Sequence, residues 1–262
     1  MKVIHLLLIF FLLAPGVTHA QEAAMPVGDG SHSDSITMLL LDIDVQIDAT
    51  QAINDMYNFK FAEAEQKFRW RKARYDWHPL PYFLLALSSW WKILPNIEVE
   101  DYDTEFNERV NEAIDVGHAL FDQNPDNIEA AFMLSAAYAF RGRLQGERRQ
   151  FRKATTSGQR ALKYFRICRG NEDFSPELLF GDGLYNYYSV YIKEEYPLLR
   201  PLLIFMKKGD KDLGIQQLRT VSNNAFYTRT EAQYFLMRIL AAEQKDQRAS
   251  LQLAGYLNQT FP

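Results

Sequence analysis

Few residues in this sequence could carry out catalysis. Beyond the first twenty residues, the histidines and cysteine are His32, His78, His118 and Cys168. No HExxH helix is present, and no cysteines and histidines stand at the spacing of a zinc site. The GxSxG nucleophile motif and a glycine-rich phosphate loop are also missing. We therefore predict no catalytic residues, no metal and no cofactor, and a protein that is not an enzyme.

Charged segments are the next candidates for chemistry. The acids of 98–105 could collect a cation, although a solvated loop is the simpler interpretation. Basic and aromatic residues alternate in 69–74, and basic residues recur in 141–153, a composition that can bind nucleic acid. The formal net charge is −4, and the N-terminus predicts export, so we expect no nucleic-acid partner. An anionic membrane surface or an acidic peptide is the alternative to plain solvated helix faces.

Two glycines, Gly181 and Gly183, interrupt a stretch that is otherwise helical and aromatic. Inside a helix each glycine costs up to about 1 kcal/mol relative to alanine. Close packing against a second helix would explain them, and so would a ligand that approaches the backbone. We favour the packing interpretation.

The N-terminus has the three-part design of a secretory signal peptide. A lysine follows Met1, residues 6–13 form an apolar run, and a small residue stands at a plausible cleavage point after Thr18 and His19. A membrane-spanning helix would need about 20 apolar residues, whereas proline and glycine soon interrupt this run. We predict a signal peptide over 1–20 and a flexible leader over 21–35. An exported chain with one cysteine, unable to form an internal disulfide, favours a bacterial periplasm.

From residue 36 onward, apolar residues recur at helical spacing, most clearly in 124–138. Pro125 ends one helix, and Asp126 and Glu129 stand at the spacing that satisfies free N–H groups at a helix start. One face of the next helix then carries Ala131, Leu134, Ser135 and Tyr138. The 18 Phe and 14 Tyr against 13 Gly and 10 Pro favour long packed helices over a turn-rich β fold. The sequence predicts an all-α protein.

These positions resemble those of tetratricopeptide (TPR) repeats. If Ile128 is position 1 of a 34-residue unit, the four residues on that face occupy positions 4, 7, 8 and 11, where TPR repeats take a large residue, leucine, a small residue and tyrosine. The same register recurs near the C-terminus with Leu236, Met237 and Leu240. The resemblance implies one TPR-like helical repeat domain over 36–262. It would be a right-handed superhelix, or solenoid, of about five helical hairpins with one continuous hydrophobic interior.

The resemblance also implies where a partner would bind. In TPR proteins, five positions of the first helix of each pair face the concave side. In the third and fifth units they select Glu129, Phe132, Ala136, Ala139, Phe140, Glu231, Tyr234 and Arg238. Aromatic side chains there would anchor a partner, and charged ones would fix its orientation. We expect a non-enzymatic scaffold of the bacterial cell envelope that binds a protein or peptide.

An apolar segment, 198–206, supports a second hypothesis. It is too short to span a bilayer, but with nearby basic residues it could lie in a membrane interface. The protein would then be a membrane-surface accessory protein. Packing of this segment into the core is the alternative.

Overall fold

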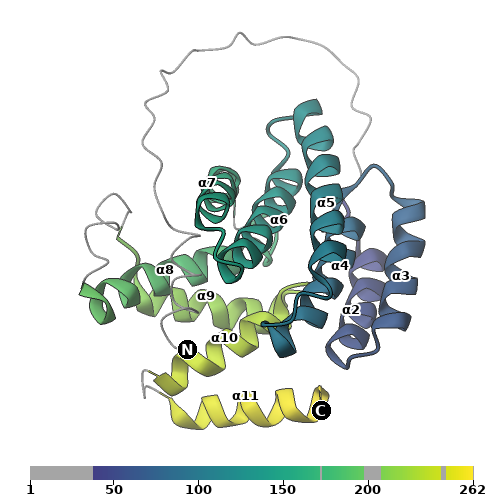
Figure 1. Cartoon of the computed structure of the whole chain (residues 1–262). Helices are drawn as coiled ribbons and strands as arrows, with labels where there is room; N and C mark the ends of the chain where they lie inside the picture. Colours follow the sequence, from purple (N-terminus) through teal and green to yellow (C-terminus); the bar gives the residue numbers. More distant parts are fainter. Residues whose placement is uncertain (1–37, 172, 198–207, 243–245, 262) are drawn as a thin grey trace, which may run out of the picture.

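The structure, a computed structural model, describes residues 38–171, 173–197, 208–242 and 246–261. Within these ranges it contains ten α-helices, one short 3-10 helix and no strand (Figure 1). The all-α class predicted from the sequence is confirmed. The predicted signal peptide, the leader and the apolar segment 198–206 lie outside the described residues.

Most consecutive helices are joined by short connections. In chain order they are α2 (Ile43–Tyr57), α3 (Phe61–Arg74), α4 (Pro79–Ile93), η1 (Leu94–Asn96), α5 (Asp103–Gln123), α6 (Ile128–Glu147), α7 (Phe151–Cys168), α8 (Leu178–Glu195), α9 (Lys211–Asn224), α10 (Arg229–Ala242) and α11 (Gln247–Thr260). Consecutive helices pack in five pairs, α2 with α3, α4 with α5, α6 with α7, α8 with α9, and α10 with α11. Neighbouring pairs also pack through α3 and α4, α5 and α6, and α9 and α10.

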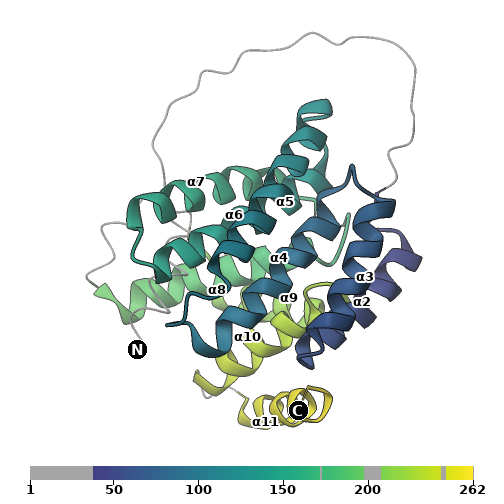
Figure 2. The same ribbon diagram turned by 45° about the vertical axis from the view of Figure 1, so that its right-hand side comes forward.

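The row of pairs is interrupted between α7 and α8. In the described part of the chain, these two helices share no interface comparable to those between the other neighbours. Figures 1 and 2 show that α8 to α11 lie beneath the arc formed by α4 to α7. The buried hydrophobic residues accordingly form two clusters, one mainly from α2 to α7 and one from α8 to α10. The expectation of one continuous interior was therefore wrong.

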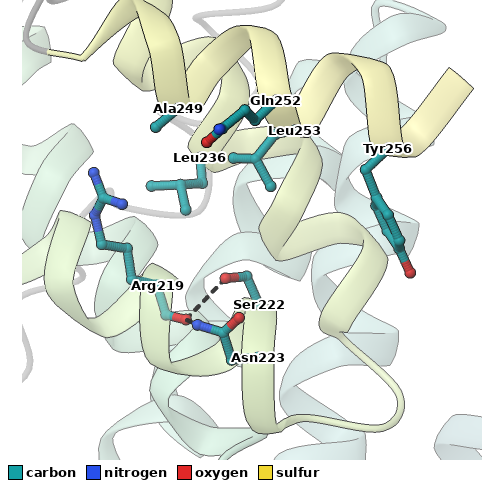
Figure 3. Close-up of a pocket in the computed structure, with 8 residues that line it drawn as sticks. All are labelled: Arg219, Ser222, Asn223, Leu236, Ala249, Gln252, Leu253 and Tyr256. Atoms are coloured by element: carbon teal, nitrogen blue, oxygen red, sulfur yellow. Dashed lines mark hydrogen bonds between the residues drawn. The ribbon is translucent and has the colours of Figure 1, made fainter.

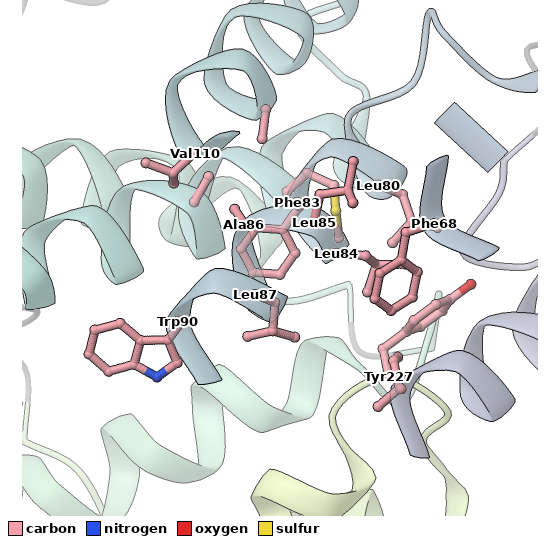
Figure 4. Close-up of a cluster of buried hydrophobic side chains, with 14 of the residues drawn as sticks. Phe68, Leu80, Phe83, Leu84, Leu85, Ala86, Leu87, Trp90, Val110 and Tyr227 are labelled. Atoms are coloured by element: carbon pink, nitrogen blue, oxygen red, sulfur yellow. The ribbon is translucent and has the colours of Figure 1, made fainter. Parts of the chain in front are cut away.

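Helix α4 is the centre of the first cluster. Its sequence PLPYFLLALSSWWKI is apolar on every side, which is typical of a helix surrounded by protein. His78 caps it, because its ring accepts a hydrogen bond from the Leu80 N–H at 3.1 Å. Figure 4 shows Phe83, Leu87 and Trp90 along α4, with Tyr227 reaching the same cluster from the α9–α10 connection.

A buried carboxylate ties that connection to the start of α8. Glu177 is 1% exposed, and its two oxygens accept hydrogen bonds from the N–H groups of Phe226, Tyr227 and Thr228 at 2.6, 3.0 and 2.9 Å. The Thr228 hydroxyl donates a fourth at 2.6 Å. These bonds compensate the cost of burying a charge. They fix the chain between α9 and α10 against the rest of the molecule.

The two glycines in α8 have the structural role that we favoured. A Cβ at Gly183 would lie 2.9 Å from Leu218, and a Cβ at Gly214 of α9 would lie 2.7 Å from the Gly183 carbonyl oxygen. A Cβ at Gly181 would lie 2.7 Å from the Phe165 ring. Helices α8 and α9 therefore approach closely because Gly183 and Gly214 lack side chains, whereas Gly181 makes room for Phe165 of α7.

Candidate functional site

Two of the predicted binding residues are structural. Glu129 is 1% exposed; its carboxylate accepts a hydrogen bond from the Leu40 N–H and lies 3.3 Å from His78 Nε2. The N-terminus of α6 is capped by Asn127, which accepts a hydrogen bond from the Ala130 N–H at 2.9 Å. Asp126, the expected cap, is exposed. Glu129 thus holds the segment before α2 and is not accessible to a partner.

Glu231 is the second acid turned inward. Its carboxyl group lies near the Tyr57 hydroxyl at the end of α2, and both Glu231 Oε2 and the Tyr57 hydroxyl are buried without a hydrogen-bond partner among the described residues. Burial raises the pKa of Glu231 to about 7, and the charge of Glu177 adds to the increase, while Tyr57 opposes it. The first and fifth helical pairs therefore meet here. Glu231 is half-buried, and its inaccessible Oε2 is turned toward this contact instead of toward a partner.

The apolar predicted residues of α6 lie at the edge of the first cluster. Phe132, Ala136, Ala139 and Phe140 are half-buried and pack against it. The Phe140 ring contacts Phe83 and Trp90 edge-on, with centroid distances of 5.7 Å in both cases. Phe140 is therefore held in place by rigid neighbours and keeps part of its surface accessible.

One turn beyond Phe140, Arg143 covers the same tryptophan. Its guanidinium lies 4.6 Å from the centre of the Trp90 ring, within range of a cation–π interaction. The TPR resemblance did not assign Arg143 to the concave face, because it follows the last position that faces that side. The sequence analysis included Arg143 only in the basic stretch 141–153, as a candidate for an anionic membrane surface or an acidic peptide.

Helix α10 contributes exposed residues. Tyr234 is 45% exposed, and its hydroxyl accepts a hydrogen bond from Arg238 at 3.2 Å. The neighbouring Phe235 is half-buried and contacts Tyr188 and Phe180 of α8, with centroids 6.3 and 6.0 Å apart. Tyr234 and Arg238, both predicted from the sequence, thus project from a packed aromatic base.

Electrostatics links these two groups of residues. Burial lowers the pKa of Arg143, and the positive charge of Arg238 lowers it further, while Glu147 and Tyr234 oppose the change. Arg143 of α6 is therefore within electrostatic range of Tyr234 and Arg238 of α10. We call the accessible parts of these residues the α6–α10 surface. It consists of Phe140, Arg143, Tyr234, Phe235 and Arg238.

The basic segments noted in the sequence are largely neutralised where they are described. In 69–74 three of the four basic residues make ion pairs: Arg69 with Glu65, Arg71 with Asp48 and Lys72 with Glu112. Arg148 donates to both oxygens of Asp103, at 2.6 and 2.8 Å. The exposed residues Arg74, Arg149, Arg152 and Lys153 remain for the membrane hypothesis, which stays a prediction.

A hollow of about 340 Å³ between α9, α10 and α11 is a second candidate (Figure 3). Ser222 and Asn223 line it, but both donate hydrogen bonds to the Arg219 carbonyl oxygen, at 2.8 and 2.9 Å. Both side chains therefore use their donors on a backbone carbonyl of their own helix, α9. Nothing in the lining resembles a nucleophile with a base.

The remaining reactive residues are embedded in the packing. His118 Nε2 lies 2.8 Å from the Tyr138 hydroxyl, and burial lowers the pKa of this histidine. Cys168 is 4% exposed, and burial raises the pKa of its thiol to about 12. The described ranges contain no group of His, Cys, Asp and Glu that could hold a metal ion. None of the described helices is both long and apolar enough to cross a membrane.

Comparisons with known proteins give no identification, since no protein-family model, curated protein or solved structure matches the chain.

Proposed function

We propose that the protein is a non-enzymatic, TPR-like scaffold that binds a segment of another protein on the α6–α10 surface. The observation that carries this proposal is that α6 and α10 each present partly exposed aromatic rings together with an arginine, Arg143 over the Trp90 ring and Arg238 bonded to the Tyr234 hydroxyl. Aromatic and arginine side chains are the residues that dominate binding energy at protein interfaces. The first-helix pattern and the five helical pairs support the TPR-like part of the proposal.

The site is adapted to binding because its aromatic residues are pre-positioned. Phe140 is supported by Phe83 and Trp90, and Phe235 by Tyr188 and Phe180. Rings held by packing lose little conformational entropy when a partner covers them. Tyr234 presents an apolar ring together with a hydroxyl, the combination that is enriched at interfaces.

The location of the scaffold follows from the N-terminal sequence. A positive residue, an apolar run and a small residue before the leader support export to a bacterial cell envelope. We therefore place the partner among envelope proteins. The membrane-surface function is the competing proposal.

The test is capture of envelope proteins by the wild-type protein and by Tyr234→Ala. Truncation of an interface anchor typically costs about 2 kcal/mol or more, so specific partners should be lost with this variant. Tyr256→Ala is the matched control, because Tyr256 is 48% exposed but lies on α11. Equal loss with both variants, or with neither, would argue against this surface. Flotation with anionic liposomes in the absence of any protein partner would favour the membrane function instead.

A further inference from the structure

Two stacked tyrosines lie where α6 packs between α5 and α7 (Figure 1). Tyr138 of α6 and Tyr164 of α7 are 2% and 4% exposed, and their rings are within 3° of parallel, with centroids 6.0 Å apart. His118 of α5 bridges them, since its Nε2 lies 2.8 Å from the Tyr138 hydroxyl and its Nδ1 lies 3.4 Å from the Tyr164 hydroxyl. Packing and hydrogen bonds therefore hold three aromatic rings from three helices as one rigid base.

Three basic side chains lie against this aromatic base. The guanidinium carbon of Arg141 is 4.7 Å from the centre of the Tyr138 ring, and that of Arg160 is 5.5 Å from the same point. The two carbons are therefore at most about 10 Å apart. Lys163 adds a third cation, with its Nζ 5.1 Å from the centre of the Tyr164 ring. We call Arg141, Arg160 and Lys163 the α5–α7 cation cluster.

None of these cations has an acidic partner among the described residues. Arg141 donates to neutral side chains of α5 and α7, at 2.9 and 3.3 Å. Arg160 uses one of its five donors, in a long hydrogen bond of 3.4 Å to the Tyr138 hydroxyl. Lys163 makes neither a hydrogen bond nor an ion pair with the described part of the chain. Most donors of the cluster are therefore available to a ligand.

Arginines at the ends of the same helices are neutralised, in contrast. Arg148 after α6 and Arg169 after α7 each pair with an aspartate, at 2.6 and 2.8 Å. Burial lowers the pKa of His118, and two exposed acids of α5, Asp115 and Asp122, oppose that change. Neither of these acids forms an ion pair with a cation of the cluster. The cluster thus keeps positive charges that the described residues leave unpaired.

We propose that the α5–α7 cation cluster binds a phosphate group. A phosphate carries about two negative charges and several strong acceptor oxygens, so that more than one cation can bind it at once. Guanidinium groups match phosphate oxygens with two parallel hydrogen bonds. Arg141 is anchored between α5 and α7, while the exposed Arg160 can change rotamer to reach the same anion.

This site is separate from the α6–α10 surface. Arg141 donates to α5 and α7, whereas Arg143 stacks on Trp90 of α4. The scaffold can therefore hold a protein segment and a phosphate group on different sides of α6. The phosphate can belong to a lipid headgroup or to a soluble phosphate ester, because the same cations recognise both.

The experiment titrates the full-length protein with inorganic phosphate, followed by phosphorus NMR at constant ionic strength. We expect saturable binding that acetate does not displace. Arg160→Gln should weaken binding about tenfold, through loss of charge-assisted hydrogen bonds. Arg160 is exposed, so this variant should fold normally. Arg152→Gln is the matched control, because Arg152 is another exposed arginine of α7, and it should change the affinity less than about twofold.

A second arm identifies the source of the phosphate. Flotation with phosphatidylglycerol vesicles but not with phosphatidylcholine vesicles, reduced by Arg160→Gln and retained by Arg152→Gln, would assign the site to an anionic lipid headgroup. Binding of inorganic phosphate without flotation would assign it to a soluble phosphate ester.

Three outcomes would overturn the inference: no saturable binding of phosphate, displacement by acetate at the same ionic strength, or equal affinity in Arg160→Gln and the wild type. Tyr234→Ala should bind phosphate like the wild type. Failure of the protein-binding proposal would therefore leave the phosphate site standing, and the reverse also holds.

Discussion

Glu231 makes the stability of this protein depend on pH in an unusual direction. Its pKa is about 7 in the folded protein, against 4.5 as the ordinary value, because burial penalises the charged form. The two pKa values differ by about 2.5, and at about 1.4 kcal/mol for each pH unit this corresponds to between about 3 and 4 kcal/mol. Below pH 4.5 the group is protonated in both states and contributes no pH dependence. Between pH 4.5 and 7 only the unfolded chain loses its proton, so the free energy of unfolding should fall as pH rises.

The assay is urea unfolding of the wild type and Glu231→Gln from pH 4.5 to 8.5 at constant ionic strength. Glutamine keeps the shape of the protonated acid, so the variant should lack this part of the pH dependence. Between pH 4.5 and 7 the wild type should lose about 3 kcal/mol of unfolding free energy relative to Glu231→Gln. Tyr57→Phe should move the midpoint upward, because the Tyr57 hydroxyl favours the charged carboxylate.

Parallel pH profiles for the wild type and Glu231→Gln would refute the reasoning, since they would mean that the carboxyl group is hydrated in solution. Glu108→Gln is the control for loss of one negative charge, because Glu108 is an exposed residue of α5. It should leave the profile unchanged. The result also bears on function, because ionising Glu231 weakens the contact between α2 and the helix that presents Tyr234.

Three further predictions concern the packing. Glu65→Ala should lower the free energy of unfolding by about 3 kcal/mol in urea titrations, because the buried Glu65 carboxylate is bonded to Arg109 and Lys92, which outweigh burial and hold its pKa at about 2, and its removal would leave the two cations to share Glu105; a loss below about 1 kcal/mol would contradict this. Gly214→Ala should lower the melting temperature by several degrees, because its Cβ would lie 2.7 Å from backbone atoms of α8, whereas Gly255→Ala has open space and should be neutral or stabilising. Cys168 should resist iodoacetamide at pH 8 until urea unfolds the protein, because its buried thiol has a pKa of about 12; rapid labelling of the native protein would show that the site opens.

Much of the helix pattern could be predicted from sequence because its signals are local. The boundary at Pro125 was predicted, and the structure ends α5 at Gln123 and begins α6 at Ile128. Close packing of α8 against another helix was predicted from Gly181 and Gly183, because glycine destabilises a helix unless packing requires it. Caps were less certain, because Asp126 and Asn127 have similar chemistry and only the backbone geometry decides which side chain reaches the free N–H groups.

The binding surface could be predicted only in part. Tyr234 and Arg238 were selected from their repeat positions and are exposed, but Glu129 and Glu231 occupy equivalent positions and are turned inward. A repeat position specifies the direction of a side chain relative to its own helix. It carries no information about another helix that arrives from a distant part of the chain.

The sequence by itself determined that this protein is all-α, where most helices begin and end, and which consecutive helices pair, since these depend on apolar periodicity, caps and prolines within one or two turns. Only the tertiary structure decided that α8 to α11 lie beneath α4 to α7, that Glu177 ties the start of α8 to the α9–α10 connection, and that Arg143 of α6 stacks on Trp90 of α4. The reason is physical. Local patterns specify which face of a helix avoids water, whereas many apolar surfaces can cover that face, and the choice among them depends on how the whole chain packs.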